Sequence, residues 1–141
     1  MVILILHVLI ALLYSFITPA FEAPDETGHF AYMVSIAQQH RLPTLSDIAS
    51  GTIALHPPLY YCLGALVLSA PHPFGVPQYP FGLDVNPRFD FWGRGEANWL
   101  SHGPEEVFPY KGNARINHFL RLTFVIMGAL TVLFTYKTAA E

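Results

Sequence analysis

The sequence has few charged residues, a single cysteine and no cluster of basic side chains. Only 12% of its 141 residues are charged and 52% are hydrophobic, whereas soluble domains usually carry about 25% charged residues. This shortage of charge favours a lipid bilayer over a large water-soluble core. A net charge of -3 without a basic stripe gives no reason to expect a nucleic-acid partner. The one cysteine, Cys62, excludes an internal disulfide.

Two long apolar runs lie towards the two ends of the chain. We expect the first, residues 1–20, to be a transmembrane helix, because about 20 apolar residues cross the hydrocarbon core of a bilayer. Thr18-Pro19 ends the run, since proline disfavours helix at the residue before it. A cleaved signal peptide is the alternative. It is disfavoured because no Lys or Arg precedes Arg41 and no typical cleavage site follows.

The second apolar run predicts another transmembrane helix at residues 116–138. Its centre, residues 122–136, carries no charge, and the basic residues Arg121 and Lys137 flank it. Most basic residues lie between Arg41 and Arg121, but the positive-inside rule loses force for loops longer than about 60 residues. Charge alone therefore does not fix the orientation of the two helices.

The segment between them, residues 21–115, is predicted to be a long loop with two short helices beside the membrane. The first covers about residues 26–41, with Asp25 as its N-cap and Leu42-Pro43 at its end. The second covers about residues 58–70, because proline suits a first helical turn and this apolar stretch is too short to span a bilayer. The expected fold class is therefore an all-α membrane protein, with two transmembrane helices flanking a loop.

The first loop helix begins with residues that could carry chemistry. Asp25 and Glu26 are adjacent carboxylates, and His29 lies one helical turn later. A carboxylate here could act as a general base on a hydroxyl, and the three side chains together could hold a divalent cation. The simpler interpretation is a helix N-terminus, where acidic residues interact favourably with the helix dipole.

The second candidate is the turn His56-Pro57-Pro58-Leu59, which fixes the direction of the His56 side chain. Backbone amides at the start of the following helix, together with a protonated imidazole, could receive a phosphate. The simpler interpretation is a junction between a loop and a helix. On spacing alone, each of the two motifs is better explained by structure than by function.

Together and in this order, the motifs resemble the first external loop of GT-C fold membrane glycosyltransferases, specifically the protein O-mannosyltransferase-like family. In that family an Asp-Glu pair follows the first membrane helix, a His-Phe follows the pair, and a His-Pro-Pro-Leu turn precedes the next helix. The matching residues here are Asp25-Glu26, His29-Phe30 and His56-Pro57-Pro58-Leu59. The likeness covers roughly residues 16–66 and the Leu120-Arg121 start of the closing helix.

The resemblance implies an inverting transferase of the cytoplasmic membrane, with the loop on the extracytoplasmic side. Such an enzyme moves a sugar from a polyprenyl-phosphate-linked donor to an acceptor hydroxyl. Asp25 would be the catalytic base, while Glu26 would assist in the acceptor site or steer a divalent cation as a possible cofactor. The residues that the resemblance assigns to substrate binding are His29, His56, Pro57, Pro58 and Arg121.

Members of that family have many more membrane helices, so we expect this chain to be the N-terminal part of a longer enzyme, inactive without the remainder. Two alternatives stay open. A non-catalytic two-helix membrane protein could bind a partner or lipid through its aromatic loop. A metal-binding loop could instead be built on Asp25, Glu26, His29 and His56.

Overall fold

The computed structural model describes residues 2–47, 51–69 and 84–140. These ranges contain four α-helices: α1 (Val2–Ile17), α2 (Glu26–Gln39), α3 (Leu59–Ser69) and α4 (Gly112–Ala139). They also contain two short 3-10 helices, η1 (Gly51–Leu55) and η2 (Pro104–Glu106). β-structure within the described ranges is limited to two isolated bridges. The predicted all-α class is therefore confirmed for this part of the chain.

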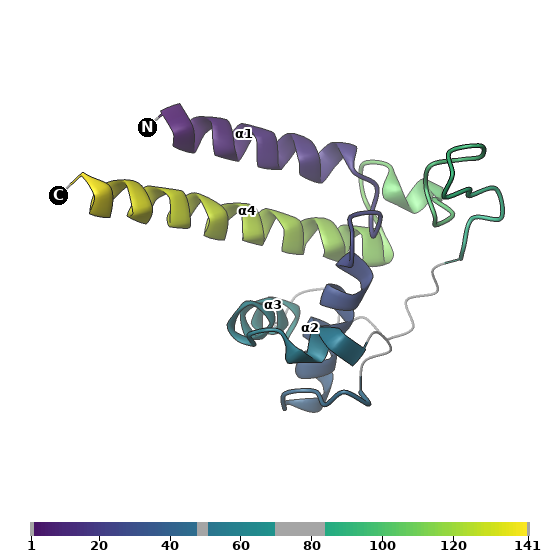
Figure 1. The fold of residues 1–141 in the computed structure, drawn as a ribbon, viewed down its shortest axis with the longest axis horizontal. Helices are drawn as coiled ribbons and strands as arrows, with labels where there is room; N and C mark the ends of the chain where they lie inside the picture. Colours follow the sequence, from purple (N-terminus) through teal and green to yellow (C-terminus); the bar gives the residue numbers. More distant parts are fainter. Residues whose placement is uncertain (1, 48–50, 70–83, 141) are drawn as a thin grey trace.

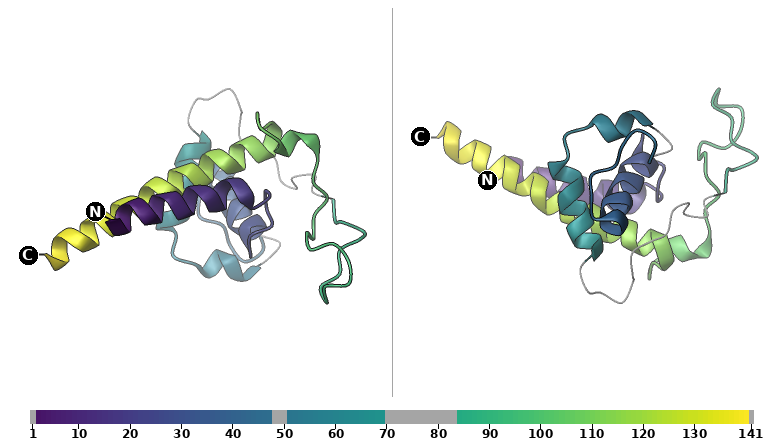
Figure 2. Two further views of the ribbon diagram at one scale, coloured as in Figure 1. Left: turned by 90° about the horizontal axis from the view of Figure 1, so that it is seen from above. Right: turned by 90° about the horizontal axis from the view of Figure 1, so that it is seen from below.

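α1 and α4 lie side by side and run antiparallel, so the start of α1 and the end of α4 are at the same end of the pair (Figure 1; Figure 2). Most apolar side chains of α1 are exposed, including Val2 at its start (70%) and Ile17 at its end (74%). Ser15 is the buried residue of this helix. A contiguous exposed apolar surface of this kind marks a face that meets lipid or another protein.

α4 is the one helix in the described ranges that is long and apolar enough to cross a membrane. At about 1.5 Å per residue, its 28 residues extend about 42 Å, against about 30 Å of hydrocarbon core. The 16 residues of α1 extend about 24 Å. The first predicted span, residues 1–20, is thus shorter than expected, and a two-span arrangement is not confirmed.

Pro19 explains why α1 ends early. The amide of Thr18 still reaches the Tyr14 carbonyl at 3.0 Å, but proline has no amide hydrogen with which to continue the helix. The chain then turns, with the Glu22 amide 3.4 Å from the Pro19 carbonyl. This turn directs the following segment away from α1 and towards α2.

α4 consists of two parts with different surroundings. The buried residues belong to its first turns: Ala114, Ile116, Asn117, His118 and Leu120. Beyond them, large apolar side chains such as Ile126 and Phe134 are about 60% exposed. The helix predicted at 116–138 therefore begins earlier, at Gly112, because its first turns pack within the protein.

α2 and α3 pack against each other beside α4 (Figure 1). Gly64 of α3 allows the two helices to approach closely, since a Cβ atom there would overlap the Met33 side chain. The aromatic rings of Tyr32 and Tyr61 stack at 3.9 Å across the same contact. Buried apolar residues of α2 and α3 thus form much of the core around which the candidate site is built.

The two short loop helices are confirmed close to their predicted bounds of about 26–41 and 58–70. α2 ends at Gln39, because His40 adopts a left-handed conformation with a φ of 53° and its amide bonds to the Ile36 carbonyl at 2.8 Å. The helix therefore stops before Pro43 is reached. The proline-rich stretch at residues 71–82 lies outside the described residues.

Candidate functional site

The centre of the candidate site is an ion pair between Glu26, at the start of α2, and Arg121 of α4. The guanidinium donates two parallel hydrogen bonds to the carboxylate, Nε to Oε1 and Nη2 to Oε2, each 2.7 Å long. The Arg121 side chain is only 11% exposed and the Glu26 side chain only 15%. A two-pronged pair of this type fixes orientation as well as charge.

Arg121 also closes the end of α1. The last carbonyls of a helix have no partner within it, and here the guanidinium supplies the donors. Nη1 donates to the carbonyls of Ser15 at 3.1 Å and Thr18 at 2.7 Å, and Nη2 donates to that of Pro19 at 2.9 Å. One side chain therefore joins α1, α2 and α4 at a single point.

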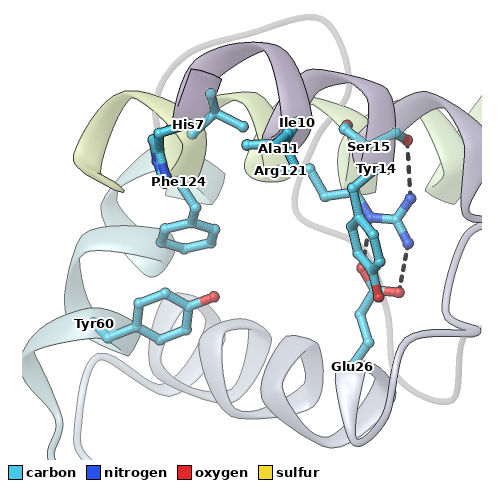
Figure 3. A pocket seen from close by; sticks show the side chains of 10 residues that line it. His7, Ile10, Ala11, Tyr14, Ser15, Glu26, Tyr60, Arg121 and Phe124 are labelled. Carbon is cyan, nitrogen blue, oxygen red and sulfur yellow. Dashed lines mark hydrogen bonds and ion pairs between the residues drawn. The ribbon is translucent and has the colours of Figure 1, made fainter. Parts of the chain in front are cut away.

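A pocket of about 490 Å³ opens beside this ion pair (Figure 3). Arg121 and Glu26 close its polar end, and the rings of Tyr60 and Phe124, stacked at 4.2 Å, border the other end. Most of the remaining wall is apolar and comes from α1 and α4: His7, Ile10, Ala11, Tyr14, Ser15 and Val125. The pocket therefore combines one charged end with a largely apolar wall.

Asp25, the neighbour of Glu26, is in a different environment. Its side chain is exposed and makes no capping hydrogen bond, and its backbone is left-handed, with a φ of 59° and a ψ of 5°. Asp25 therefore occupies the predicted N-cap position, where its carbonyl accepts the His29 amide at 3.0 Å, but its carboxylate does not cap the helix. An N-cap residue needs an extended backbone for its carboxylate to reach the first-turn amides. A left-handed aspartate stores backbone strain of about 1–2 kcal/mol, as residues at functional sites often do.

The two histidine motifs meet at a residue that was not among the predicted site residues. The Tyr61 hydroxyl lies 2.7 Å from Nδ1 of His29 and 2.9 Å from Nδ1 of His56. His56 is exposed, whereas Tyr61 is buried. Pro57 and Pro58 are exposed and precede α3, so they set the turn that brings the His56 ring back over Tyr61.

The charges around His29 shift its pKa in opposite directions. Burial, followed by the charge of His56, lowers the pKa of His29, and the carboxylates of Asp25 and Glu26 offset part of that change. Burial also raises the pKa of Tyr61, with a smaller contribution from Tyr32. At neutral pH, His29 is therefore mainly uncharged and the Tyr61 hydroxyl keeps its proton.

A third cluster, around His102, contacts the connection between α1 and α2 through Glu22. Its Nε2 is 2.9 Å from Glu22 and its Nδ1 is 2.7 Å from Glu106. Burial lowers the pKa of His102, but the hydrogen bonds to Glu106 and Glu22 outweigh burial and raise it overall. His102 and Glu106 were not among the predicted site residues, because Glu22 lies 80 positions from the histidine in the sequence.

The structure brings Glu26 and Arg121 together, and separately brings together His29 and His56. Within the described ranges no three His, Cys, Asp or Glu side chains are arranged to hold a metal ion. The candidate metal ligands Asp25, Glu26 and His29 thus do not form a ligand set here.

Compared with known proteins, the chain matches no family model, no curated protein and no solved structure.

Proposed function

We propose that this chain forms the catalytic loop of an inverting membrane glycosyltransferase that uses a polyprenyl-phosphate-linked sugar. The unequal environment of two adjacent carboxylates carries the proposal. Glu26 is held and neutralised by Arg121, whereas the exposed Asp25 carboxylate caps no helix and is free to take up a proton. The resemblance of the two motifs to the protein O-mannosyltransferase-like family supports the same assignment.

In the proposed reaction, Asp25 acts as the general base. Its carboxylate accepts the proton of the acceptor hydroxyl while that oxygen attacks the anomeric carbon of the donor sugar. The new carbon–oxygen bond forms as the bond from that carbon to the phosphate oxygen breaks, so the configuration inverts and polyprenyl phosphate leaves with the bonding electrons. An N–H of His56 is suited to donate a hydrogen bond to the phosphate that leaves. Glu26, held by Arg121, fixes the turn that presents Asp25.

The helix pair supports a membrane location for this chemistry. α1 extends about 24 Å, and the part of α4 beyond its buried first turns, residues 122–139, extends about 27 Å. We propose that both cross the membrane as neighbours, with Arg121 at its surface and the loop on the extracytoplasmic side. The pocket beside Arg121 has a largely apolar wall suited to a lipid chain.

The decisive experiment replaces Asp25 in the full protein and measures transfer in membranes. The donors are polyprenyl-phosphate mannose, glucose and arabinose, each with a radiolabelled sugar. Asp25→Asn should lower the transfer rate by about 100-fold or more, because the general base is lost while the shape is kept. Asp84→Asn is the matched control, since Asp84 is an exposed loop carboxylate. Equal transfer by the two variants would reject the proposal.

A second candidate function is attachment to a membrane surface or partner through the loop. Three of its aromatic side chains are strongly exposed: Phe91 at 80%, Trp92 at 77% and Phe108 at 80%. Aromatic rings of this kind anchor proteins at lipid headgroups. The emission of Trp92 should then shift to the blue when lipid vesicles are added to the protein in detergent. No shift, together with loss of transfer in Asp25→Asn, would favour the enzyme.

A further inference from the structure

Tyr61 places a single hydroxyl between two imidazoles. The side chain is 3% exposed, and its oxygen is within hydrogen-bond distance of Nδ1 on both His29 and His56. A phenol hydroxyl carries one proton to donate and lone pairs with which to accept. Burial, with a contribution from Tyr32, raises the pKa of Tyr61, so that proton stays on the oxygen.

These contacts restrict where each imidazole carries its hydrogen. A neutral imidazole has one N–H and one bare nitrogen. The ring that accepts the Tyr61 proton at Nδ1 must have its hydrogen at Nε2, and the other ring must donate from Nδ1. Two Nδ1–H donors would leave the buried hydroxyl proton without an acceptor among the described residues. Two bare Nδ1 atoms would leave one contact without a hydrogen, and both outcomes are unfavourable in a buried site.

We propose that Tyr61 holds His29 and His56 in opposite tautomers and makes the three side chains a relay for one proton. The proposal goes beyond the glycosyltransferase assignment, because it rests on these hydrogen bonds and holds for any reaction at the site. Tyr61 is a positioning residue in this scheme: it contacts no substrate and acts through the two histidines.

The relay conserves protons and bonds. A proton adds to the bare Nε2 of His56, and the Nδ1 proton of that ring passes to the Tyr61 oxygen. Tyr61 passes its own proton to Nδ1 of His29, and His29 releases the proton from its Nε2. Both hydrogen bonds are present before and after, with their directions reversed. One proton has entered at His56 and one has left at His29.

The two ends of the relay face different surroundings. His56 is exposed to solvent. His29 borders a small cavity of about 60 Å³ between α2, α3 and α4 that Glu26, Asn117 and Arg121 also line. The Asn117 side chain is 97% buried, as its exposed fraction is 3%, and its amide nitrogen has no partner among the described residues. The relay therefore links solvent to a cavity between α2, α3 and α4.

Nitrogen-15 NMR of the histidine rings tests the proposal directly. The full chain is reconstituted in lipid nanodiscs and studied at a pH well above the ordinary imidazole pKa. His29→Gln and His56→Gln each remove one set of signals and so assign the two rings. We expect the Nδ1–H fractions of His29 and His56 to add to one, even when the tautomers exchange rapidly. Independent rings would both favour hydrogen at Nε2, giving a sum far below one.

Tyr61→Phe removes the shared hydroxyl and should lower this sum towards the value for independent rings. Tyr136→Phe is the matched control, because Tyr136 lies near the end of α4 and is 56% exposed; it should leave the sum at one. A sum near zero or two in the unmodified protein would overturn the relay, as would an unchanged sum in Tyr61→Phe. If Tyr61→Phe loses its helical circular dichroism, the unmodified protein alone decides.

Discussion

Two clusters of charged side chains hold the connection between α1 and α2, and they differ in the group that supplies the positive charge. In one, Arg121 binds Glu26 and the carbonyls that end α1. In the other, His102 lies between Glu22 and Glu106. Arginine stays charged at any pH that a protein experiences, whereas imidazole titrates near neutral pH. The connection is thus held at every pH by Arg121 and in a pH-dependent way by His102.

The largest loss of stability is expected when the cluster around Arg121 is broken. Arg121→Gln should lower the free energy of unfolding by about 3 kcal/mol, because Glu26 keeps a largely buried charge and the end of α1 loses its donors. The free energy of unfolding of Arg121→Lys should lie between those of the unmodified protein and Arg121→Gln. An ammonium keeps the charge but cannot form the two parallel hydrogen bonds. Chemical denaturation in detergent micelles measures both.

A matched control exists elsewhere in the chain. Arg41 also makes a two-pronged pair, with both Asp47 oxygens at 2.9 Å, but its side chain is 51% exposed. Arg41→Gln should leave the unfolding transition almost unchanged, because exposed ion pairs contribute little. If both arginine variants lowered stability equally, burial would not be what distinguishes the two pairs.

The cluster around His102 should respond to pH. The pKa of His102 is raised in the folded protein, so its stabilising contribution is complete below the unfolded pKa of about 6.5. That contribution is lost as the pH rises through the folded pKa. We expect the loop around Trp99 to loosen between neutral and alkaline pH, because the Trp99 amide is hydrogen-bonded to Glu22. The emission of Trp99 should then shift to the red.

Trp92→Phe isolates this signal, since the chain has two tryptophans. In that background, His102→Gln should remove the pH dependence, because glutamine does not titrate in this range. A red shift of the same size in His102→Gln would assign the effect to another group.

The smallest expected effect is a difference in melting temperature between variants of the two carboxylates that His102 contacts. Glu22 accepts hydrogen bonds from the amides of Trp99 and Leu100 as well as from the histidine. Glu106 accepts one amide, that of Ala20, at 3.4 Å. Glu22→Gln should therefore lower the melting temperature more than Glu106→Gln. The reverse order would mean that the His102–Glu106 contact dominates the cluster.

The short helices could be predicted from sequence because their signals are local. Pro57 and Pro58 mark the start of α3, and the apolar pattern after Glu26 indicates α2. The prediction that the Asp25 carboxylate caps α2 failed because the backbone in the turn before α2 is left-handed at Asp25. Backbone conformation in such a turn depends on what the neighbouring segments pack against.

The sequence by itself determined a helical chain with apolar ends, and it placed Asp25, Glu26, His29 and His56 among the residues of interest. Local hydropathy and proline positions suffice for the helices, and residue type and spacing suffice for the candidate residues, because these signals act over a few residues. Only the tertiary structure decided which partners these side chains have. Arg121 meets Glu26 across 95 positions and Tyr61 meets His29 across 32. Such pairings depend on how the helices pack, so one carboxylate is neutralised while its neighbour stays exposed.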